Sequence, residues 1–332
     1  MEFGVAISTS REGLFYPIGF ATPSSLVKMA KVAEELGFEC VWGNDHLTTQ
    51  SYIKKRGDHP NFFEPMITFS YLSAVTSKVK FGTGVVVGPT RNPVILAKQA
   101  ITLDHLGRGR FILGVGLGAY REEFEAFGGV GNRGVMLDEM VESLTLLLSE
   151  KSTVSYEGKH FHFNDIEMFP KPLTKPFPLY VGGNSPEVLR RAAYYATGWI
   201  PASMSLDDIQ RSRGKIEEFA HGRGRDSSKI VVAPESICGI DNDPRQARRK
   251  FAKSLIFEHL LSLKKSTLKD ISLSEDELIE RNFIGSPSNI IKKLEPYDKA
   301  GIDQMWFDFI GDTNSEVLGQ MKLFAKEVMP SF

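Results

Sequence analysis

The pair Asp45-His46 in VWGNDHL is the ionisable pair whose position in the sequence best suits chemistry. It follows a short apolar run, so we expect it at the carboxyl end of a parallel strand, where barrel enzymes build their active sites. A histidine titrates near neutral pH and can accept or release a proton beside a reacting ring. A lone histidine is often structural, and nothing in the sequence shows its partner. His46, together with Asp45, is therefore a candidate catalytic residue.

A glycine-rich stretch, FILGVGLGAYRE, raises a second kind of chemistry. Its Gly114-x-Gly116-x-x-Ala119 spacing fits a loosened dinucleotide fingerprint, in which glycines let backbone N–H groups approach a pyrophosphate. That fingerprint also requires a strand that ends in an acidic residue about 20 positions later. Here the next segment, GVMLDEMVESLTLLL, has helical periodicity, with Asp138 and Glu139 inside it. We therefore expect these glycines to serve tight packing or to make room for a flat ring.

A phosphate-binding turn is predicted at LYVGGNSPEVLRRAA. An apolar run leads into Gly182, Gly183 and Asn184. Ser185 is then placed to cap a helix that has a proline in its first turn. Unpaired N–H groups and the positive end of the helix would face the barrel rim, an arrangement that holds phosphate. The simpler interpretation is an ordinary turn that uses glycine for its conformation and binds nothing.

Other polar clusters give weaker signals. His160 and His162 in EGKHFHF share one face of a predicted hairpin strand, but no third ligand lies at a supporting spacing, so no metal site is predicted. Glu235 and Asp308 at strand ends give thin support to a metal-dependent lyase. The chain has no nucleophile elbow, Cys-x-x-Cys pair or Walker-type loop, so a serine or cysteine triad has no support.

The elements that must position these residues follow one pattern, in which short apolar runs alternate with longer amphipathic segments. Eight runs are typical of strands: FGVAIS, ECVW, VKFGTGVVV, RFILGVG, PLYVGG, GWIP, KIVVAPESI and DQMWFDFI. Amphipathic segments lie between them, with Ser24 or Ser25, Ser185 and Ser286 as expected N-caps and Gly37, Gly107 and Gly301 at expected C-terminal ends. Eight β-α units without a linker predict an α/β fold, a (β/α)8 TIM barrel forming one domain over residues 1–332.

Such a barrel needs roughly 250 residues, so the remaining residues must lie in insertions. Three segments supply them: residues 43–63, 151–177 and 241–285. The first and third follow strands on the side where loops form barrel active sites, which makes them candidate substrate lids.

The overall composition excludes several kinds of partner. With 40 basic and 41 acidic residues the net charge is −1, so no overall field attracts nucleic acid or an anionic membrane. No apolar run approaches the roughly 20 residues that span a bilayer, and the start lacks a signal peptide. Cys40 and Cys238 lie in apolar runs and imply no disulfide. We expect a cytoplasmic protein that acts on a small molecule.

Several segments together resemble the luciferase-like flavin-dependent oxidoreductases, the superfamily of bacterial luciferase and of the deazaflavin-dependent reductases and dehydrogenases. They are VWGNDHL, FGTGVVVGPTRNPVILAKQAITLDHLGRGRFILGVGLG, YREEFEAFG with NRGVMLDEMVESL, VSYEGKHFHF, FPKPLTKPFPLYVGGNSPEVLRRAAYYATGW and FIGSP. The resemblance runs from the first strand to the last helix. It implies a (β/α)8 barrel that holds flavin mononucleotide (FMN) or the deazaflavin coenzyme F420, with the ring at the rim and the phosphate at a helix N-terminus.

Carried over onto this chain, the resemblance places Asp45 and His46 beside the coenzyme ring. Thr83, Gly84 and Val85 match a bulge in the third strand, behind the ring, where relatives carry a cis peptide. That peptide is expected here between Gly84 and Val85.

The resemblance also assigns residues to the rest of the coenzyme. Gly182, Gly183, Asn184 and Ser185 match the phosphate loop, and Gly116 and Tyr120 lie where the fourth strand opens beneath the ring. One departure narrows the chemistry. Sugar-phosphate dehydrogenases of this family carry a glutamate acid just after the glycines of that strand, where this chain has Ala119-Tyr120. Sugar phosphate oxidation is therefore not expected.

The activity that the resemblance implies is hydride transfer between coenzyme F420 and a small organic substrate, with His46 tuning or protonating the reacting system. F420 is favoured over FMN because Asp45-His46 and the segment from the third to the fourth strand look more like those of its users. The alternatives are an FMN-dependent monooxygenase that uses molecular oxygen and a flavin-binding protein without catalysis. Relatives commonly pair, so a homodimer is expected.

Overall fold

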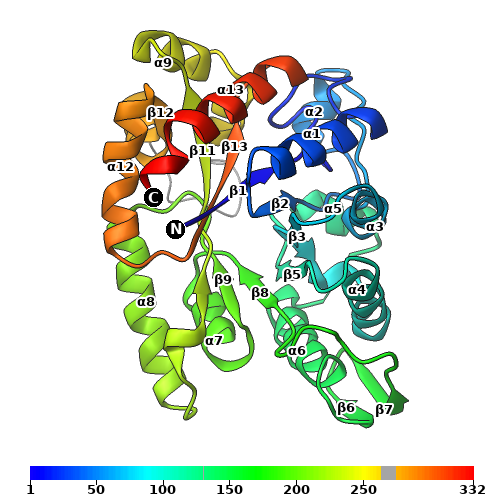
Figure 1. The fold of residues 1–332 in the computed structure, drawn as a ribbon. Coiled ribbons are helices and arrows are strands. Elements are labelled where there is room, and N and C mark those ends of the chain that lie inside the picture. Colours follow the sequence, from blue (N-terminus) through cyan, green and yellow to red (C-terminus); the bar gives the residue numbers. More distant parts are fainter. Residues whose placement is uncertain (130, 263–273) are drawn as a thin grey trace.

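The computed structural model describes residues 1–129, 131–262 and 274–332 and folds them around a parallel sheet (Figure 1). Its strands, in chain order, are β1 (Glu2–Ala6), β2 (Cys40–Gly43), β3 (Lys80–Thr83), β4 (Val86–Val87), β5 (Phe111–Gly116), β8 (Leu179–Gly182), β9 (Gly198–Ile200), β10 (Val231–Val232), β11 (Glu235–Ile240), β12 (Phe283–Gly285) and β13 (Gln304–Phe309). These runs are buried on both faces, as expected for a parallel sheet covered by helices.

The sheet closes into a barrel at a strand that is split in two. β10 pairs with β9, whereas β11 pairs with β13. Between the two halves, the Glu235 N–H donates to the Pro201 carbonyl at 2.9 Å and the Trp306 N–H donates to the Pro234 carbonyl at 3.1 Å. Both neighbours of the split strand are thereby joined to it, and the predicted (β/α)8 barrel is confirmed.

Helices cover the outside of the barrel, with α8 and α12 on one side and α3 and α4 on the other (Figure 1). They are α1 (Pro23–Glu35), α3 (Pro65–Val75), α4 (Pro93–Leu106), α6 (Arg133–Leu147), α7 (Pro186–Tyr195), α8 (Leu206–His221), α12 (Pro287–Lys299) and α13 (Asn314–Glu327). Each corresponds to an amphipathic segment predicted from the sequence. In α1, for example, the buried residues Leu26, Met29, Ala30 and Ala33 recur at three and four positions.

The three predicted insertions contain further elements. Residues 43–63 include α2 (Ser51–Lys55), and residues 151–177 form the antiparallel hairpin of β6 (Thr153–Glu157) and β7 (His162–Glu167) beside α6. Residues 241–285 hold α9 (Pro244–Ala252), α10 (Leu255–Ser262), α11 (Glu275–Arg281) and β12, and residues 263–273 of this insertion lie outside the described residues. β12 was not predicted; it pairs with the outer part of β11.

One expected helix cap is wrong. The N-cap of α1 is Thr22, not Ser24 or Ser25, and the Thr22 hydroxyl accepts the Ser25 N–H while the Ser25 hydroxyl accepts the Thr22 N–H. Pro23 takes the first helical position, where a missing N–H costs no hydrogen bond. The residue that caps the helix is therefore Thr22, the hydroxyl residue directly before the proline.

Two stacked indoles fill the barrel interior. The rings of Trp42 and Trp306 lie 5.0 Å apart at an interplanar angle of 14°. Gly82 makes room for them, because a Cβ there would lie 2.5 Å from the Trp42 ring. In the part of the chain that the structure describes, no helix has the length and apolar character needed to cross a membrane.

Candidate active site

A cavity of about 230 Å³ lies at the carboxyl ends of the barrel strands. Its lining includes Arg11, Phe15, Asp45, His46, Gly84, Val85, Tyr120, Glu235, His259 and Asp308. Ligand cavities are commonly about 300–1,000 Å³, so this one suits a ring-sized part of a ligand. The first and third insertions both contribute to it, through His46 and His259.

A larger open hollow of about 550 Å³ lies between α9 and α13. The residues predicted from the sequence as site residues are not among those that line it. Its Lys250 is paired with Asp241 at 2.9 Å. The cavity at the strand ends is therefore the candidate active site.

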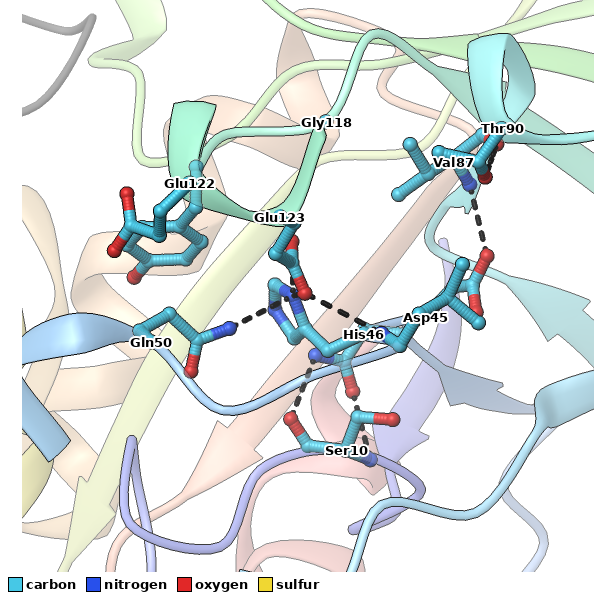
Figure 2. Close-up of polar contacts among 12 residues, drawn as sticks. Ser10, Asp45, His46, Gln50, Val87, Thr90, Gly118, Glu122 and Glu123 are labelled. Carbon is cyan, nitrogen blue, oxygen red and sulfur yellow. Dashed lines mark hydrogen bonds and ion pairs between the residues drawn. The ribbon is translucent and has the colours of Figure 1, made fainter. Parts of the chain in front are cut away.

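His46 faces a buried glutamate from α5 (Arg121–Ala126), as Figure 2 shows. His46 Nδ1 lies 3.2 and 3.1 Å from the two carboxylate oxygens of Glu123, whose side chain is 5% exposed. The same carboxylate accepts the Leu47 N–H at 3.3 Å, and the Gln50 side-chain amide lies 3.2 Å from Nδ1. An ionised carboxylate only accepts hydrogen bonds, so this contact is a hydrogen bond in the tautomer with a proton on Nδ1, and that tautomer leaves Nε2 able to accept a proton.

Glu123 was not among the site residues predicted from the sequence, because the positions directly after the glycines of β5 hold no acid. The acid that reaches His46 comes from the first turn of α5 instead. The run REEFEA shows that glutamates are present, but packing decides which one points inward. Glu122 accepts the Ser51 N–H, and Glu125 forms an ion pair with Arg121.

Asp45, the neighbour of His46, is held in a different environment. Its Oδ2 accepts the Val87 N–H at 3.0 Å and an Arg91 N–H at 2.8 Å. Arg91 was not predicted from the sequence as a site residue, and it also pairs with Glu64 at 3.0 Å. Asp45 Oδ1 is buried and accepts no hydrogen bond from the described residues. The carboxylate thus anchors the loop after β4, and its predicted catalytic role stays a prediction.

The bulge between β3 and β4 forms one wall of the cavity. The peptide bond between Gly84 and Val85 is cis, as the resemblance implied. Thr83 Oγ1 donates to the Gly114 carbonyl and accepts the Gly114 N–H, both at 2.8 Å. Gly84 and Val85 line the cavity, while Thr83 ties the bulge to β5.

Gly116 and Gly182 leave space for the side chain of Val85. A Cβ at Gly116 would lie 2.5 Å from Val85 Cγ2, and one at Gly182 would lie 2.5 Å from Val85 Cγ1. The Val85 side chain therefore occupies the space beside these glycines. A bound ring would contact Val85 rather than Gly116 or Gly182. Their assignment to the coenzyme stays a prediction.

Tyr120 belongs to a cluster of three side chains over His46, here called the cap cluster: Tyr52, Tyr120 and His259. His259 Nδ1 lies 3.0 Å from the Tyr52 hydroxyl and 3.4 Å from the Tyr120 hydroxyl. Burial lowers the pKa of His259 to about 3, so its ring is neutral and Nδ1 can accept a hydrogen bond from a tyrosine hydroxyl. The ring of Tyr120 lies 5.5 Å from that of His46. The cap cluster joins three separate segments above the cavity.

The predicted phosphate loop lies at the N-terminus of α7 and is held by the neighbouring β9. The Trp199 indole N–H donates to the Gly183 carbonyl at 2.8 Å, and the Asn184 side chain both donates to and accepts from the Ala202 backbone. Ala202 in turn lines the cavity. Gly183 has a φ of +126°, a conformation that favours glycine.

Ser185 is the N-cap residue of α7, as predicted, but its hydroxyl makes no cap hydrogen bond to the helix. Glu187 is an exposed acid of the first turn. Its pKa is lowered by hydrogen bonds from the Ser185 hydroxyl and from the backbone N–H of Glu187 itself. An anion at this helix end would replace that carboxylate. Phosphate binding here stays a prediction.

Glu235 and Asp308, the acids noted at strand ends, meet at one arginine. Arg11 Nη2 donates to Glu235 at 2.9 Å, and Arg11 Nε lies 3.0 Å from Asp308 Oδ1. Within residues 1–129, 131–262 and 274–332, no group of three or more His, Cys, Asp or Glu is placed to hold a metal ion.

Comparison with known proteins gives relatives along the whole chain. It is 28% identical over 325 residues to the F420-dependent glucose-6-phosphate dehydrogenase of Kineococcus radiotolerans, covering 93% of each chain. It is 26% identical over 351 residues to the 5,10-methylenetetrahydromethanopterin reductase of Methanopyrus kandleri, covering 93% of this chain and 95% of the relative. It is also 26% identical to the alkanal monooxygenase alpha chain of Photorhabdus luminescens, covering 92% of this chain and 90% of the relative.

Solved structures share the fold at lower identity. The monooxygenase RslO1 from Streptomyces bottropensis superposes with a TM-score of 0.80 at 21% identity, covering 99% of both chains. An F420-dependent secondary alcohol dehydrogenase gives the same TM-score and identity, covering 99% of this chain and 98% of its own. The sequence model of the luciferase-like monooxygenase family matches residues 1–304, which is nearly the whole barrel. The chain therefore belongs to the luciferase-like monooxygenase family of oxidoreductases.

Proposed function

We propose that this protein transfers a hydride between coenzyme F420 and a small organic substrate bound in the cavity at the barrel rim. The relatives whose names state F420 dependence support this choice of coenzyme. The alkanal monooxygenases among the relatives make FMN with oxygen the competing chemistry.

The residues around the cavity fit a flavin-type coenzyme. Val85 and Val87 offer an apolar wall against which a flat ring can lie. Asp45 Oδ1 is a buried acceptor without a hydrogen bond from the described residues, and it needs a ligand N–H or O–H. Flavin and deazaflavin rings carry an imide N–H, and their side chains carry hydroxyls. Gly183 and Ser185, near Ala202 on the same rim, would hold the phosphate at the N-terminus of α7.

The observation that carries the proposal is the pair of His46, which lines the cavity, and Glu123, which contacts His46 Nδ1. The bound coenzyme would supply a ring carbon that accepts or donates the hydride. His46 would take the proton that leaves a substrate oxygen or return it in the reverse direction. Glu123 would be the positioning residue, since its carboxylate contacts Nδ1 and fixes the orientation of the His46 ring.

Coenzyme binding is the first test. Purified protein is titrated separately with F420 and with FMN, and binding is followed by absorbance and fluorescence. F420 should bind more tightly than FMN, and the loaded protein should not consume oxygen. Oxygen consumption that depends on FMN would contradict the choice of F420, and binding of neither coenzyme would contradict the proposed function.

Variants of the pair test the role of His46. In a hydride-transfer assay with F420 and a panel of small alcohols, His46→Asn should lower kcat by about 10²–10⁴-fold, with little change in coenzyme affinity. Glu123→Gln should also lower kcat and should change the His46 ring nitrogen resonances in ¹⁵N NMR spectra. Glu122→Gln is the matched control, since Glu122 contacts the Ser51 backbone. Unchanged turnover in His46→Asn would make His46 a structural residue.

We also propose a homodimer that associates through α3 and α4. Ile67 and Tyr71 on α3 and Ile95 on α4 support it, because all three are large apolar side chains exposed to solvent. The buried, unpaired thiols of Cys40 and Cys238 support a cytoplasmic location.

A further inference from the structure

Three charged residues of the cavity wall form a cluster that the proposed chemistry of His46 does not use. The cluster consists of Arg11 from the connection after β1, Glu235 at the start of β11 and Asp308 in β13, and it is called the Arg11 cluster below. The side chains of Arg11 and Asp308 are 4% and 0% exposed, and that of Glu235 is 22% exposed. All three line the cavity.

One guanidinium serves two carboxyl groups in this cluster. The Arg11–Glu235 contact is a hydrogen bond of 2.9 Å, whereas the 3.0 Å contact of Arg11 Nε with Asp308 lacks hydrogen-bond alignment. Neither oxygen of Asp308 accepts a hydrogen bond from the described residues. The ring of Phe15 lies 4.5 Å from the Arg11 guanidinium and makes its surroundings apolar. An ionised Asp308 would therefore be a buried charge with poor compensation.

A proton on Asp308 resolves this imbalance, because a protonated carboxyl group is neutral and leaves no buried charge to be compensated. Burial, together with Glu235, raises the pKa of Asp308 well above its usual range, although Arg11 opposes the shift. With Asp308 protonated, the Arg11 cluster has no net charge.

The other titratable groups near Asp308 add no net charge at this end of the cavity. Tyr16, on the same connection as Arg11, keeps its proton because burial raises its pKa. Across the cavity, Asp45 is paired with Arg91, and His259 is neutral because burial lowers its pKa. The charge that a ligand meets at this end of the cavity is therefore that of the Arg11 cluster.

We propose that the Arg11 cluster binds an uncharged, hydroxyl-bearing part of the substrate and excludes anionic groups. Glu235, the most exposed member, accepts a hydrogen bond from the substrate hydroxyl, and the protonated Asp308 donates one to the hydroxyl oxygen. A carboxylate or phosphate would instead meet the Glu235 carboxylate, while Arg11 is already occupied by its two partners. This inference rests on the proposed function, because it takes the cavity as the substrate site.

The test compares two probes of similar size, cyclohexanol and cyclohexanecarboxylate. Their dissociation constants are measured by ligand-observed NMR on protein loaded with F420 and on protein without coenzyme. The unmodified protein should prefer cyclohexanol by at least tenfold. In the double variant Glu235→Gln, Asp308→Asn, Arg11 has no acidic partner, so the preference should shift by at least tenfold toward the carboxylate.

Controls separate this effect from a general change of charge or fold. Asp241→Asn removes one negative charge outside the cavity and should leave the preference unchanged. F420 affinity and the unfolding temperature are measured for every variant. If the double variant does not fold, Glu235→Gln alone should reduce the discrimination between the probes. An equal preference in the unmodified protein and the variants, or no binding of cyclohexanol to the unmodified protein, would overturn the inference.

The coenzyme titrations distinguish failure of the inference from failure of the proposed function. If neither F420 nor FMN binds, the proposed function fails whatever the probes show. If the double variant changes F420 affinity but not the probe preference, the Arg11 cluster contacts the coenzyme and the inference is wrong. The proton is tested independently by ¹³C NMR of the Asp308 carboxyl group, which should remain protonated near neutral pH; titration near the ordinary value of about 3.9 would contradict the protonated Asp308.

Discussion

The two ionisable residues at the end of β2 have different surroundings and therefore different chemistry. His46 Nδ1 contacts the Glu123 carboxylate, which leaves the second ring nitrogen to exchange protons. Asp45 is tied up by Arg91 and by the Val87 N–H. Adjacent positions in the chain thus give one group suited to proton transfer and one that fixes a loop, because each partner comes from a distant segment.

The buried His259 makes stability depend on pH. Its pKa is lowered to about 3 in the folded protein by burial, whereas an unfolded histidine titrates near about 6.5. Between these values the unfolded chain binds a proton that the folded chain does not, so this residue lowers stability as the pH falls below about 6.5 and has no such effect above it.

We therefore expect His259→Gln to weaken the pH dependence of unfolding. Relative to the unmodified protein, the free energy of unfolding should gain about 1.4 kcal/mol for each pH unit well below 6.5. Urea unfolding at pH 7 and at pH 5 measures this difference. His162→Gln, on the exposed face of β7, is the control and should leave the pH dependence of the free energy of unfolding unchanged. Parallel pH profiles for the unmodified protein and His259→Gln would contradict the shifted pKa.

Among the elements, the bulge between β3 and β4 depends most closely on its neighbours. β5 supplies Gly116 and β8 supplies Gly182, and together they leave just enough room for Val85. Thr83 adds two hydrogen bonds to Gly114. Two strands therefore hold the cavity wall in place, and a change on either strand reaches the cavity.

Gly116→Ala tests this dependence. Its Cβ would lie 2.5 Å from Val85 Cγ2, so we expect a loss of about 1–3 kcal/mol in the free energy of unfolding. The double variant Gly116→Ala, Val85→Ala should lose less than the sum of the two single changes. Gly214→Ala, inside α8 with no atom within 4 Å of the new Cβ, should instead gain roughly 0.5–1 kcal/mol. Additive losses in the double variant would show that the two side chains do not meet.

The strands and helices were predictable because burial imposes simple patterns on them. Apolar runs bounded by glycine and proline marked all eight barrel strands, although the run KIVVAPESI was predicted as one strand despite Pro234, which lies between β10 and β11. β12 has only three residues, too few for a pattern. At α1, the predicted caps Ser24 and Ser25 both follow the proline, whereas the N-cap is Thr22, which precedes it.

The site was predictable only in part. His46 could be predicted because it follows a strand end. Its partner Glu123 is 77 positions away, and the Arg11–Glu235 contact joins residues 224 positions apart. Such pairs arise from barrel closure, which local periodicity does not describe.

At the scale of the whole molecule, exposed apolar side chains gather on neighbouring helices. Ile67, Tyr71 and Ile95 are 67%, 57% and 60% exposed, and α3 packs beside α4 (Figure 1). Large apolar side chains grouped on one surface are typical of an interface between copies of a chain.

We expect Ile67→Lys to weaken self-association at least tenfold, because a charge would be buried in the proposed interface. Sedimentation equilibrium over a range of concentrations measures the dissociation constant. Ile18→Lys, at an exposed apolar residue in the connection after β1, should leave it unchanged. A monomer at all concentrations would remove the basis for the dimer.

The stacked indoles inside the barrel have an optical consequence. All three tryptophans of the chain, Trp42, Trp199 and Trp306, are fully buried, and a Cβ on Gly84 would lie 2.8 Å from the Trp306 ring. Indole emission overlaps the absorption of flavin-type rings. A ring held against Gly84 would therefore quench the fluorescence of Trp306 by energy transfer. The protein's own fluorescence would then report whether the cavity is filled, without any attached label.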